Sequence, residues 1–239
     1  MKDCQKEGFE HDVDEVAYKK LKEFPYFKNY LDLTMFELNN IMTASKAAET
    51  ACTGPRKFAF LGSGPMPLTS LCILSWLRDC SSNILTQTLY ANHNTAGALE
   101  VYNIDRDANA IALSQKLCDV LGKKGEGMRF VCDDAGSDGY DLKTFDVIYM
   151  AALVGRSQAE KEEVMLNIAS RMRAGALLVV RTAWNLKTCL YGEVDITSSR
   201  LTKVLEPCLE AHPYGQIVNS VIIARKKSAS KANEDGTPN

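Results

Sequence analysis

One run in the chain, Gly62-Ser63-Gly64-Pro65, is suited to binding a nucleoside. It follows an apolar stretch at 58–61 that predicts a short buried strand, and it opens a segment that predicts a helix over 65–77. Glycines have no Cβ, so the backbone can turn tightly there and approach a ligand closely. Unpaired N–H groups at the following helix N-terminus would face the same ligand. A plain connection between strand and helix is the alternative interpretation.

Four further residues lie at or just after the ends of predicted strands and could contact such a ligand. Asp105 ends the stretch 99–105, where a carboxylate can accept hydrogen bonds from both ribose hydroxyls. Asp134 and Ala135 follow the strand predicted at 128–132, and an aspartate there could accept from the adenine amino group. The adjacent Asp133 cannot be separated from Asp134 by pattern. Ala151 lies at the end of the next apolar strand and could pack on the adenine face. The alternatives are a helix cap for Asp105, a solvated turn for Asp134 and core packing for Ala151.

The elements that would position these residues alternate between strand and helix. Strands are predicted at 58–61, 99–105, 128–132, 145–152 and 176–180, with helices at 65–77, 107–121 and 158–172. This alternation argues for a mainly parallel sheet covered on both faces. Two further segments, 201–210 (strand or short helix) and 216–225 (strand), are separated by a tight turn at 212–215, so we expect an antiparallel hairpin. The predicted class is α/β, a Rossmann-like S-adenosylmethionine-dependent transferase fold with a C-terminal hairpin, which a nicotinamide-binding Rossmann domain usually lacks.

The chain divides into three parts. Residues 1–54 form a short N-terminal helical cap, with helix-like spacing from 15 to 49 interrupted at Pro25. Residues 55–226 form the Rossmann-like domain, which carries an insertion at 78–98. The polar stretch 227–239 is expected to be a disordered tail, because it cannot bury enough apolar surface to order itself.

Composition narrows the class of protein. The chain has 239 residues, 46% of them hydrophobic, and a net charge of -2, so it has no general attraction to nucleic acid or to an anionic membrane. It lacks an apolar run of the roughly 20 residues that a membrane helix needs and starts with a polar, acidic segment unlike a secretory signal. Its 8 scattered cysteines and 3 histidines predict reduced thiols, a cytoplasmic location and no protein-bound metal.

Several motifs together resemble nicotianamine synthase. They run from about Phe24 to Lys226: Phe24-Pro-Tyr-Phe-Lys-Asn-Tyr-Leu-Asp-Leu33, Leu61-Gly-Ser-Gly-Pro-Met-Pro-Leu-Thr-Ser70, Tyr102-Asn-Ile-Asp105, Met150-Ala-Ala-Leu-Val-Gly155 and Val218-Asn-Ser-Val-Ile-Ile-Ala-Arg-Lys226. The resemblance implies that the chain condenses S-adenosylmethionine molecules into nicotianamine, a metal chelator, and releases methylthioadenosine. S-adenosylmethionine would then be a substrate, and an amine would attack the Cγ of its aminocarboxypropyl arm. Metal would bind the product and not the protein, which implies a role in metal homeostasis.

The resemblance also suggests residues for the reaction. Glu37 is the candidate carboxylate that holds the proton of the attacking amine, and its spacing from Tyr30 and Tyr26 can place all three on one helix face. Arg181, just past the fifth strand, could pair bidentately with a substrate carboxylate, and Tyr191 falls where the family also has a tyrosine. Alternatively, Glu37 is a solvated helix residue and the two tyrosines pack in the core. Arg181 would then form a structural salt bridge, and Tyr191 would be a wall residue.

Three departures from the family leave the function open. The N-terminal helical part is shorter than is typical, so the acceptor chamber is open, incomplete, or completed by a second chain in a homo-oligomer. The turn at 212–216 lacks the acidic residues that the family tends to carry, and the insertion at 78–98 is unfamiliar. An S-adenosylmethionine-dependent methyltransferase and a truncated, non-catalytic paralogue therefore remain as alternatives.

Overall fold

A computed structural model describes residues 15–46, 54–81, 98–137, 139–183, 188, 193–213 and 219–228. Four sequence-based expectations lie outside these residues: the N-terminal 14 residues, most of the insertion at 78–98, Tyr191, and the tail beyond 228. The hairpin turn at 212–215 is described only in part.

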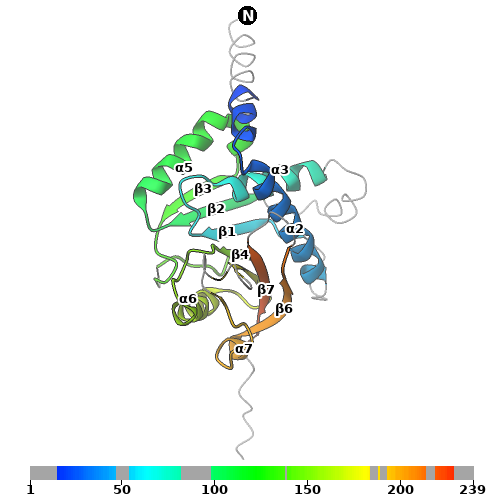
Figure 1. The fold of residues 1–239 in the computed structure, drawn as a ribbon, viewed down its shortest axis with the longest axis vertical. Helices are drawn as coiled ribbons and strands as arrows, with labels where there is room; N and C mark the ends of the chain where they lie inside the picture. The colour runs from blue at the N-terminus through cyan, green and yellow to red at the C-terminus, as the bar shows by residue number, and fades with distance from the viewer. Residues whose placement is uncertain are drawn as a thin grey trace, which may run out of the picture.

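A seven-stranded sheet in the order β3-β2-β1-β4-β5-β7-β6 forms the centre of the fold (Figure 1). Neighbours from β3 to β5 pair in parallel, whereas β7 is antiparallel to both β5 and β6. The predicted class, including the C-terminal antiparallel hairpin, is therefore confirmed. The strand bounds are β1 Lys57–Leu61, β2 Glu100–Asp105, β3 Met128–Cys132, β4 Val147–Met150, β5 Leu177–Thr182, β6 Leu205–Ala211 and β7 Ser220–Lys226.

Helices cover both faces of the sheet (Figure 1). One core cluster joins the sheet to α2, α3 and α5, and a second joins it to α6 and the short α7. The helix bounds are α2 Phe27–Lys46, α3 Leu68–Ser81, α5 Ala108–Leu121, the 3-10 turn η1 Gly122–Gly125, α6 Gln158–Arg171 and α7 Leu201–Val204. Residues 15–22 are also helical, and Pro25 lies in the turn before α2, as its fixed φ predicts.

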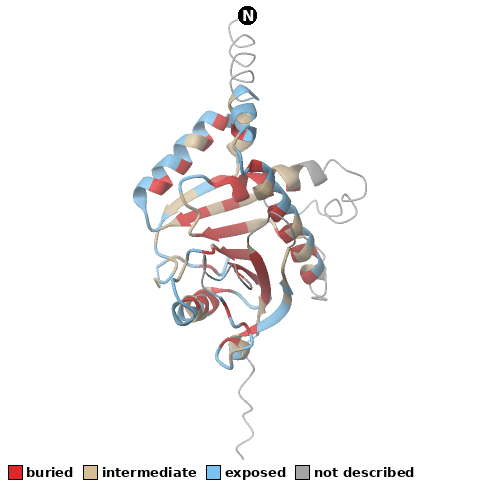
Figure 2. Ribbon diagram, viewed as in Figure 1, coloured by how far each residue is buried: buried red, intermediate tan, exposed pale blue. Residues whose placement is uncertain are grey.

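Successive strand residues alternate between the two cores, because side chains of a strand point to opposite faces. In β1, Phe58 and Phe60 belong to the α2 and α3 side, while Ala59 and Leu61 belong to the α6 side. Burial is nearly continuous along the central strands, which Figure 2 shows in red. This two-sided burial explains why these strands read as apolar runs in the sequence.

Several predicted boundaries were wrong. The helix expected from Pro65 begins three residues later, at Leu68, because a residue before proline disfavours helical backbone and Pro67 therefore excludes Met66 from the first turn. β4 is shorter than the apolar run that predicted it, and β7 begins only at Ser220. Arg181 lies inside β5 rather than after it.

The edge strand β6 differs from the central strands. Its burial alternates irregularly, and its pairing with β7 shifts register between Pro207 and Leu209. Glu206 on this strand forms an ion pair with Arg225 of β7 at 3.0 Å. None of the helices that the structure describes is both long enough and apolar enough to cross a membrane.

Candidate active site

The site lies where the strand order reverses, between β1 and β4. Loops that leave these two neighbouring parallel strands run in opposite directions, which opens a crevice at their carboxyl ends. The glycine turn follows β1, and residues 151–157, which we call the divider loop, follow β4. Two cavities open at this edge and share Gly62, Ala151 and Leu153 in their walls.

The glycine turn needs both of its glycines. Gly62 and Gly64 have φ values of 76° and 67°, in the left-handed region that favours glycine. A Cβ on Gly62 would lie 2.5 Å from a methyl carbon of Val154, so the divider loop packs directly on the turn. The Ser114 hydroxyl donates to the Gly64 carbonyl at 2.7 Å, which fixes the turn against α5.

Asp105 connects the glycine turn to the end of β2. Its Oδ2 accepts from the Gly64 N–H at 2.8 Å, and its Oδ1 accepts from the Asp107 N–H at 3.0 Å. Each carboxylate oxygen has a second acceptor site, so both remain able to accept from a ligand hydroxyl. The side chain of Asp107 in turn caps α5 by accepting from the Asn109 N–H.

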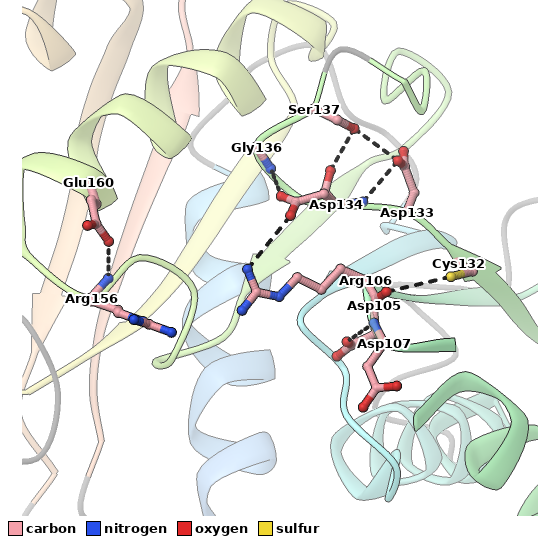
Figure 3. Close-up of polar contacts among 10 residues, drawn as sticks. All are labelled: Asp105, Arg106, Asp107, Cys132, Asp133, Asp134, Gly136, Ser137, Arg156 and Glu160. Carbon is pink, nitrogen blue, oxygen red and sulfur yellow. Dashed lines mark hydrogen bonds and ion pairs between the residues drawn. The ribbon is translucent and has the colours of Figure 1, made fainter. Parts of the chain in front are cut away.

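The two aspartates after β3 have different hydrogen-bond partners (Figure 3). Asp133 folds into its own turn, where its Oδ1 accepts from the Asp134 N–H and the Ser137 hydroxyl, both at 2.9 Å. Asp134 accepts from the Gly136 N–H through Oδ1 and lies 3.9 Å from Arg106 through Oδ2. Asp134 is the more exposed of the two acids, and the Arg106 side chain points toward it (Figure 3).

The larger cavity, which we call the acidic compartment, has a volume of about 820 Å³. Acidic side chains dominate its charged lining: Asp105, Asp133, Asp134, Glu160 and Glu163. Ala135, Ala151 and Val154 give it an apolar wall. The lining combines hydrogen-bond acceptors with apolar side chains, which suits a nucleoside.

The smaller cavity, the aromatic compartment, has a volume of about 420 Å³. Its aromatic lining comes from Phe24, Tyr26, Tyr30 and Phe60. Arg181 is the single charged residue in its wall among those that the structure describes. A cation in an otherwise neutral cavity suits a small ligand that carries a carboxylate.

Arg181 forms a buried bidentate ion pair with Glu37. The Nε and Nη2 atoms donate to the two Glu37 oxygens at 2.8 and 2.9 Å, and the side chains are 7% and 0% exposed. Burial alone lowers the pKa of Arg181, but the charge and hydrogen bonds of Glu37 outweigh it and raise that pKa. The guanidinium also lies over the Phe60 ring at 5.3 Å. Arg181 is therefore charged, and its position is fixed from two sides.

The structure places the predicted aromatic and acidic residues of the helical segment differently. Tyr26, which is 62% exposed, and Tyr30 both line the aromatic compartment. Glu37 lines neither compartment; it lies behind Arg181, which stands between it and the cavity. Burial, followed by the charge of Glu37, raises the pKa of the neighbouring Tyr149 well above its ordinary value. Glu37 could therefore influence a ligand only through Arg181.

Lys161 of α6 holds the divider loop by hydrogen bonds to its main chain. This lysine is 0% exposed, and its ammonium donates to the carbonyls of Ala152 at 2.6 Å and Val154 at 3.0 Å. Burial lowers the pKa of Lys161 to about 8. At the loop end, the Ser157 hydroxyl accepts from the Glu160 N–H. The Glu160 carboxylate accepts from the Arg156 N–H (Figure 3), and the two contacts together cap the start of α6.

Sequence reasoning missed Arg106 and Lys161. A signal existed for each: Arg106 directly follows the predicted ribose acid, and Lys161 stands four and seven residues before the apolar Met165 and Ile168, on the buried face of its helix. It also missed that Glu37 and Arg181, which were considered separately, contact each other.

The strand order, the glycine turn after β1 and the acid at the end of β2 define an S-adenosylmethionine-dependent transferase fold. The nicotianamine synthase protein family matches residues 11–231 of the chain. Nicotianamine synthase of Solanum lycopersicum is 36% identical over 203 residues, covering 85% of this chain and 56% of the relative. Nicotianamine synthase 3 of Oryza sativa subsp. indica is 35% identical over 214 residues, covering 89% and 56%. The chain belongs to the nicotianamine synthase family, and it spans about half the length of these relatives.

Solved structures agree on the fold. A variant of MtNAS in complex with S-adenosylmethionine has a TM-score of 0.60 and 21% identity, covering 92% of this chain and 72% of the other. Magnesium protoporphyrin IX methyltransferase from Synechocystis PCC 6803, with bound SAH, has a TM-score of 0.55 and 12% identity, covering 83% and 84%. A methyltransferase and a nicotianamine synthase thus share this sheet.

Proposed function

We propose that the chain is a nicotianamine synthase, which transfers 3-amino-3-carboxypropyl groups between S-adenosylmethionine molecules and releases methylthioadenosine. The observation that carries this proposal is the pair of compartments that meet at Gly62, Ala151 and Leu153. One suits a nucleoside and the other suits a carboxylate-bearing arm, so the bond between sulfur and the arm would lie at their junction. Structures of MtNAS with S-adenosylmethionine, and with MTA and tNA, support the same substrate class.

The reaction needs orientation more than chemical activation. A sulfonium has three electrophilic carbons, and in-line placement of one of them selects the product. The amine lone pair forms a new bond to Cγ while the Cγ–S bond breaks and its electron pair stays on sulfur. The amine then loses a proton to a base, and the sulfur leaves as a neutral thioether.

Residues of the acidic compartment would hold the nucleoside. Asp105 accepts from the ribose hydroxyls, and Asp134 accepts from the adenine amino group, since Asp133 is tied into its own turn. Ala135 and Ala151 pack on the adenine. Ser63 of the glycine turn lines the other compartment, and its buried hydroxyl has no hydrogen-bond partner among the described residues, so it is available to the arm of the substrate. Gly62, Gly64 and Pro65 shape the turn.

Residues of the aromatic compartment would hold the acceptor. Arg181 uses Nε and Nη2 to bind Glu37, which leaves Nη1 to pair with a substrate carboxylate. Tyr30 and Tyr26 enclose the acceptor amine in the same cavity. Glu37 supports catalysis through the position and charge of Arg181, because it does not reach the cavity itself. Tyr191 remains a proposed acceptor contact outside the described residues.

The proposal extends to the domain organisation, the fate of the product, the cellular location and the oligomeric state. Residues 1–54 would act as the helical cap, 55–226 as the catalytic domain, and 227–239 as a disordered tail. Metal would bind the product, which assigns the chain to metal homeostasis. The described cysteines, Cys72, Cys118, Cys132 and Cys208, are free thiols, which supports a cytoplasmic location. A homo-oligomer would complete the acceptor chamber if the short cap leaves it open.

Incubation of the purified chain with S-adenosylmethionine labelled in its arm tests the function. Methylthioadenosine together with a labelled multi-carboxylate amine, identified by mass spectrometry, is the expected result. S-adenosylhomocysteine would instead indicate a methyltransferase, for which the shared fold gives a basis. The absence of both products would indicate a non-catalytic relative.

A further inference from the structure

Lys161 is a buried cation that the proposed reaction does not use. It is 0% exposed, and among the ion pairs of the described residues none includes it. Its two hydrogen bonds go to main-chain carbonyls, those of Ala152 and Val154. Burying a charged group without a counter-ion is costly, so its contacts must matter to the loop that receives them.

Both acceptors of Lys161 belong to the divider loop. Their carbonyls are two residues apart and converge on one ammonium from α6, at 2.6 and 3.0 Å. Without this donor, the buried Ala152 carbonyl and the part-buried Val154 carbonyl would both lose their partner, which is unfavourable. The backbone of the loop is therefore shaped around the head of this lysine.

The residue after these carbonyls closes the loop tightly against the same helix. Gly155 has a φ of 74°, and a Cβ there would lie 2.9 Å from the Lys161 main-chain nitrogen and 2.8 Å from its Cγ. Only glycine fits between the loop and the first turn of α6. The loop and the lysine thus form one packed unit.

This unit forms the wall between the two compartments. Ala151 and Leu153 line both cavities, Ala152 lines the aromatic one, and Val154 lines the acidic one. Val154 also packs on Gly62 of the glycine turn. A shift of the loop would therefore change the nucleoside side and the acceptor side together.

We propose that Lys161 is a positioning residue, which holds the divider loop in the shape that both compartments require. This inference rests on the proposed function for its effect on ligands, but the loop itself can be measured without any ligand. Lys161→Met keeps the straight side chain and removes the donors. Ile168→Ala is the control, since Ile168 is 0% exposed on the same helix and lines neither cavity. Lys161→Arg restores a donor.

The first measurement is amide hydrogen exchange in the full chain without ligand. The Val154 and Arg156 amides, bonded to the Ala151 carbonyl and to Glu160, report on the loop. Lys161→Met should accelerate their exchange by about tenfold or more, whereas Ile168→Ala should lower the melting temperature and leave the ratio of loop to core exchange unchanged. Equal loop protection in Lys161→Met and the parent would overturn the proposal.

The second measurement is calorimetric titration with methylthioadenosine and S-adenosylmethionine. Lys161→Met should weaken both by about tenfold, with recovery in Lys161→Arg and no change in Ile168→Ala. Should Lys161→Met fail to fold, Gly155→Ala pushes the loop away from Lys161, since the added Cβ would lie 2.8 Å from the Lys161 Cγ. It should give the same exchange and affinity changes, and unchanged values there refute the inference. A parent that binds neither ligand, but whose loop loses protection in Lys161→Met, refutes the proposed function and supports the positioning role.

Discussion

Replacing Glu37 by glutamine is expected to destabilise the fold strongly. The change leaves the Arg181 guanidinium, 7% exposed, without its counter-charge inside the protein. Removing one partner of a buried ion pair typically costs about 3–5 kcal/mol, because the remaining charge stays buried and unpaired. Glutamine keeps one acceptor oxygen, so we expect the lower end of that range, about 3 kcal/mol.

A double-mutant cycle separates the pair from its surroundings. Equilibrium urea unfolding of the parent, Glu37→Leu, Arg181→Met and the double variant gives the coupling energy of the two side chains. Apolar residues of similar volume commonly replace a buried pair at little net cost, so the double variant should be more stable than either single one. Asp32→Asn is the control: its partner Lys28 is 80% exposed, and such surface pairs contribute under about 1 kcal/mol.

The same cycle tests the reaction. We expect the folded double variant to release no methylthioadenosine, because the aromatic compartment has lost its cation. Additive losses in the two single variants, each below about 1 kcal/mol, would show that the pair does not hold the helix to the sheet. Full activity in the double variant would remove both residues from the mechanism.

Three further predictions concern the glycine turn, the acids after β3 and the buried lysine. Asp134→Asn should weaken methylthioadenosine binding in calorimetry by about tenfold, whereas Asp133→Asn should change the local turn more than the affinity; equal affinity losses would contradict our assignment. Gly62→Ala should lose both stability and binding, since its Cβ would lie 2.5 Å from a carbon of the divider loop. The Cβ of Gly64→Ala meets nothing within 4 Å, so this variant should show only the strain of its positive φ, about 1 kcal/mol. Thermal melts compare the stability of the two variants. Burial lowers the pKa of Lys161 to about 8 from 10.5, so between these values the unfolded chain binds more protons and stability rises with pH; Lys161→Met should lose this rise, and parallel pH profiles would refute it.

The sequence predicted those parts of the fold that depend on local periodicity. β2, β3 and α5 have almost the expected bounds, because alternating or helical apolar spacing, together with the cap at Asp107, determines them. The start of α3 was missed because two prolines, at 65 and 67, act on the residues before them as well as on themselves.

The candidate site was predictable only in part, for a related reason. Positions at strand ends follow from topology, and Asp105 and Asp134 indeed line one cavity. Contacts between distant segments do not follow from spacing: Glu37 and Arg181 are 144 residues apart, and only the packing of α2 on the sheet brings them together. Lys161 was overlooked because a lysine is ordinarily assigned to the solvent face of a helix.

One of the two edge strands, β6, has a consequence for how the protein behaves at high concentration. An unpaired strand rim invites further strands from other molecules and can seed fibrous aggregates. In β6, Pro207 has no N–H to donate, and the pairing with β7 shifts register between Pro207 and Leu209. Carboxylates also occupy the strand at Glu206 and Glu210. Such an edge resists the addition of a strand from another molecule at β6.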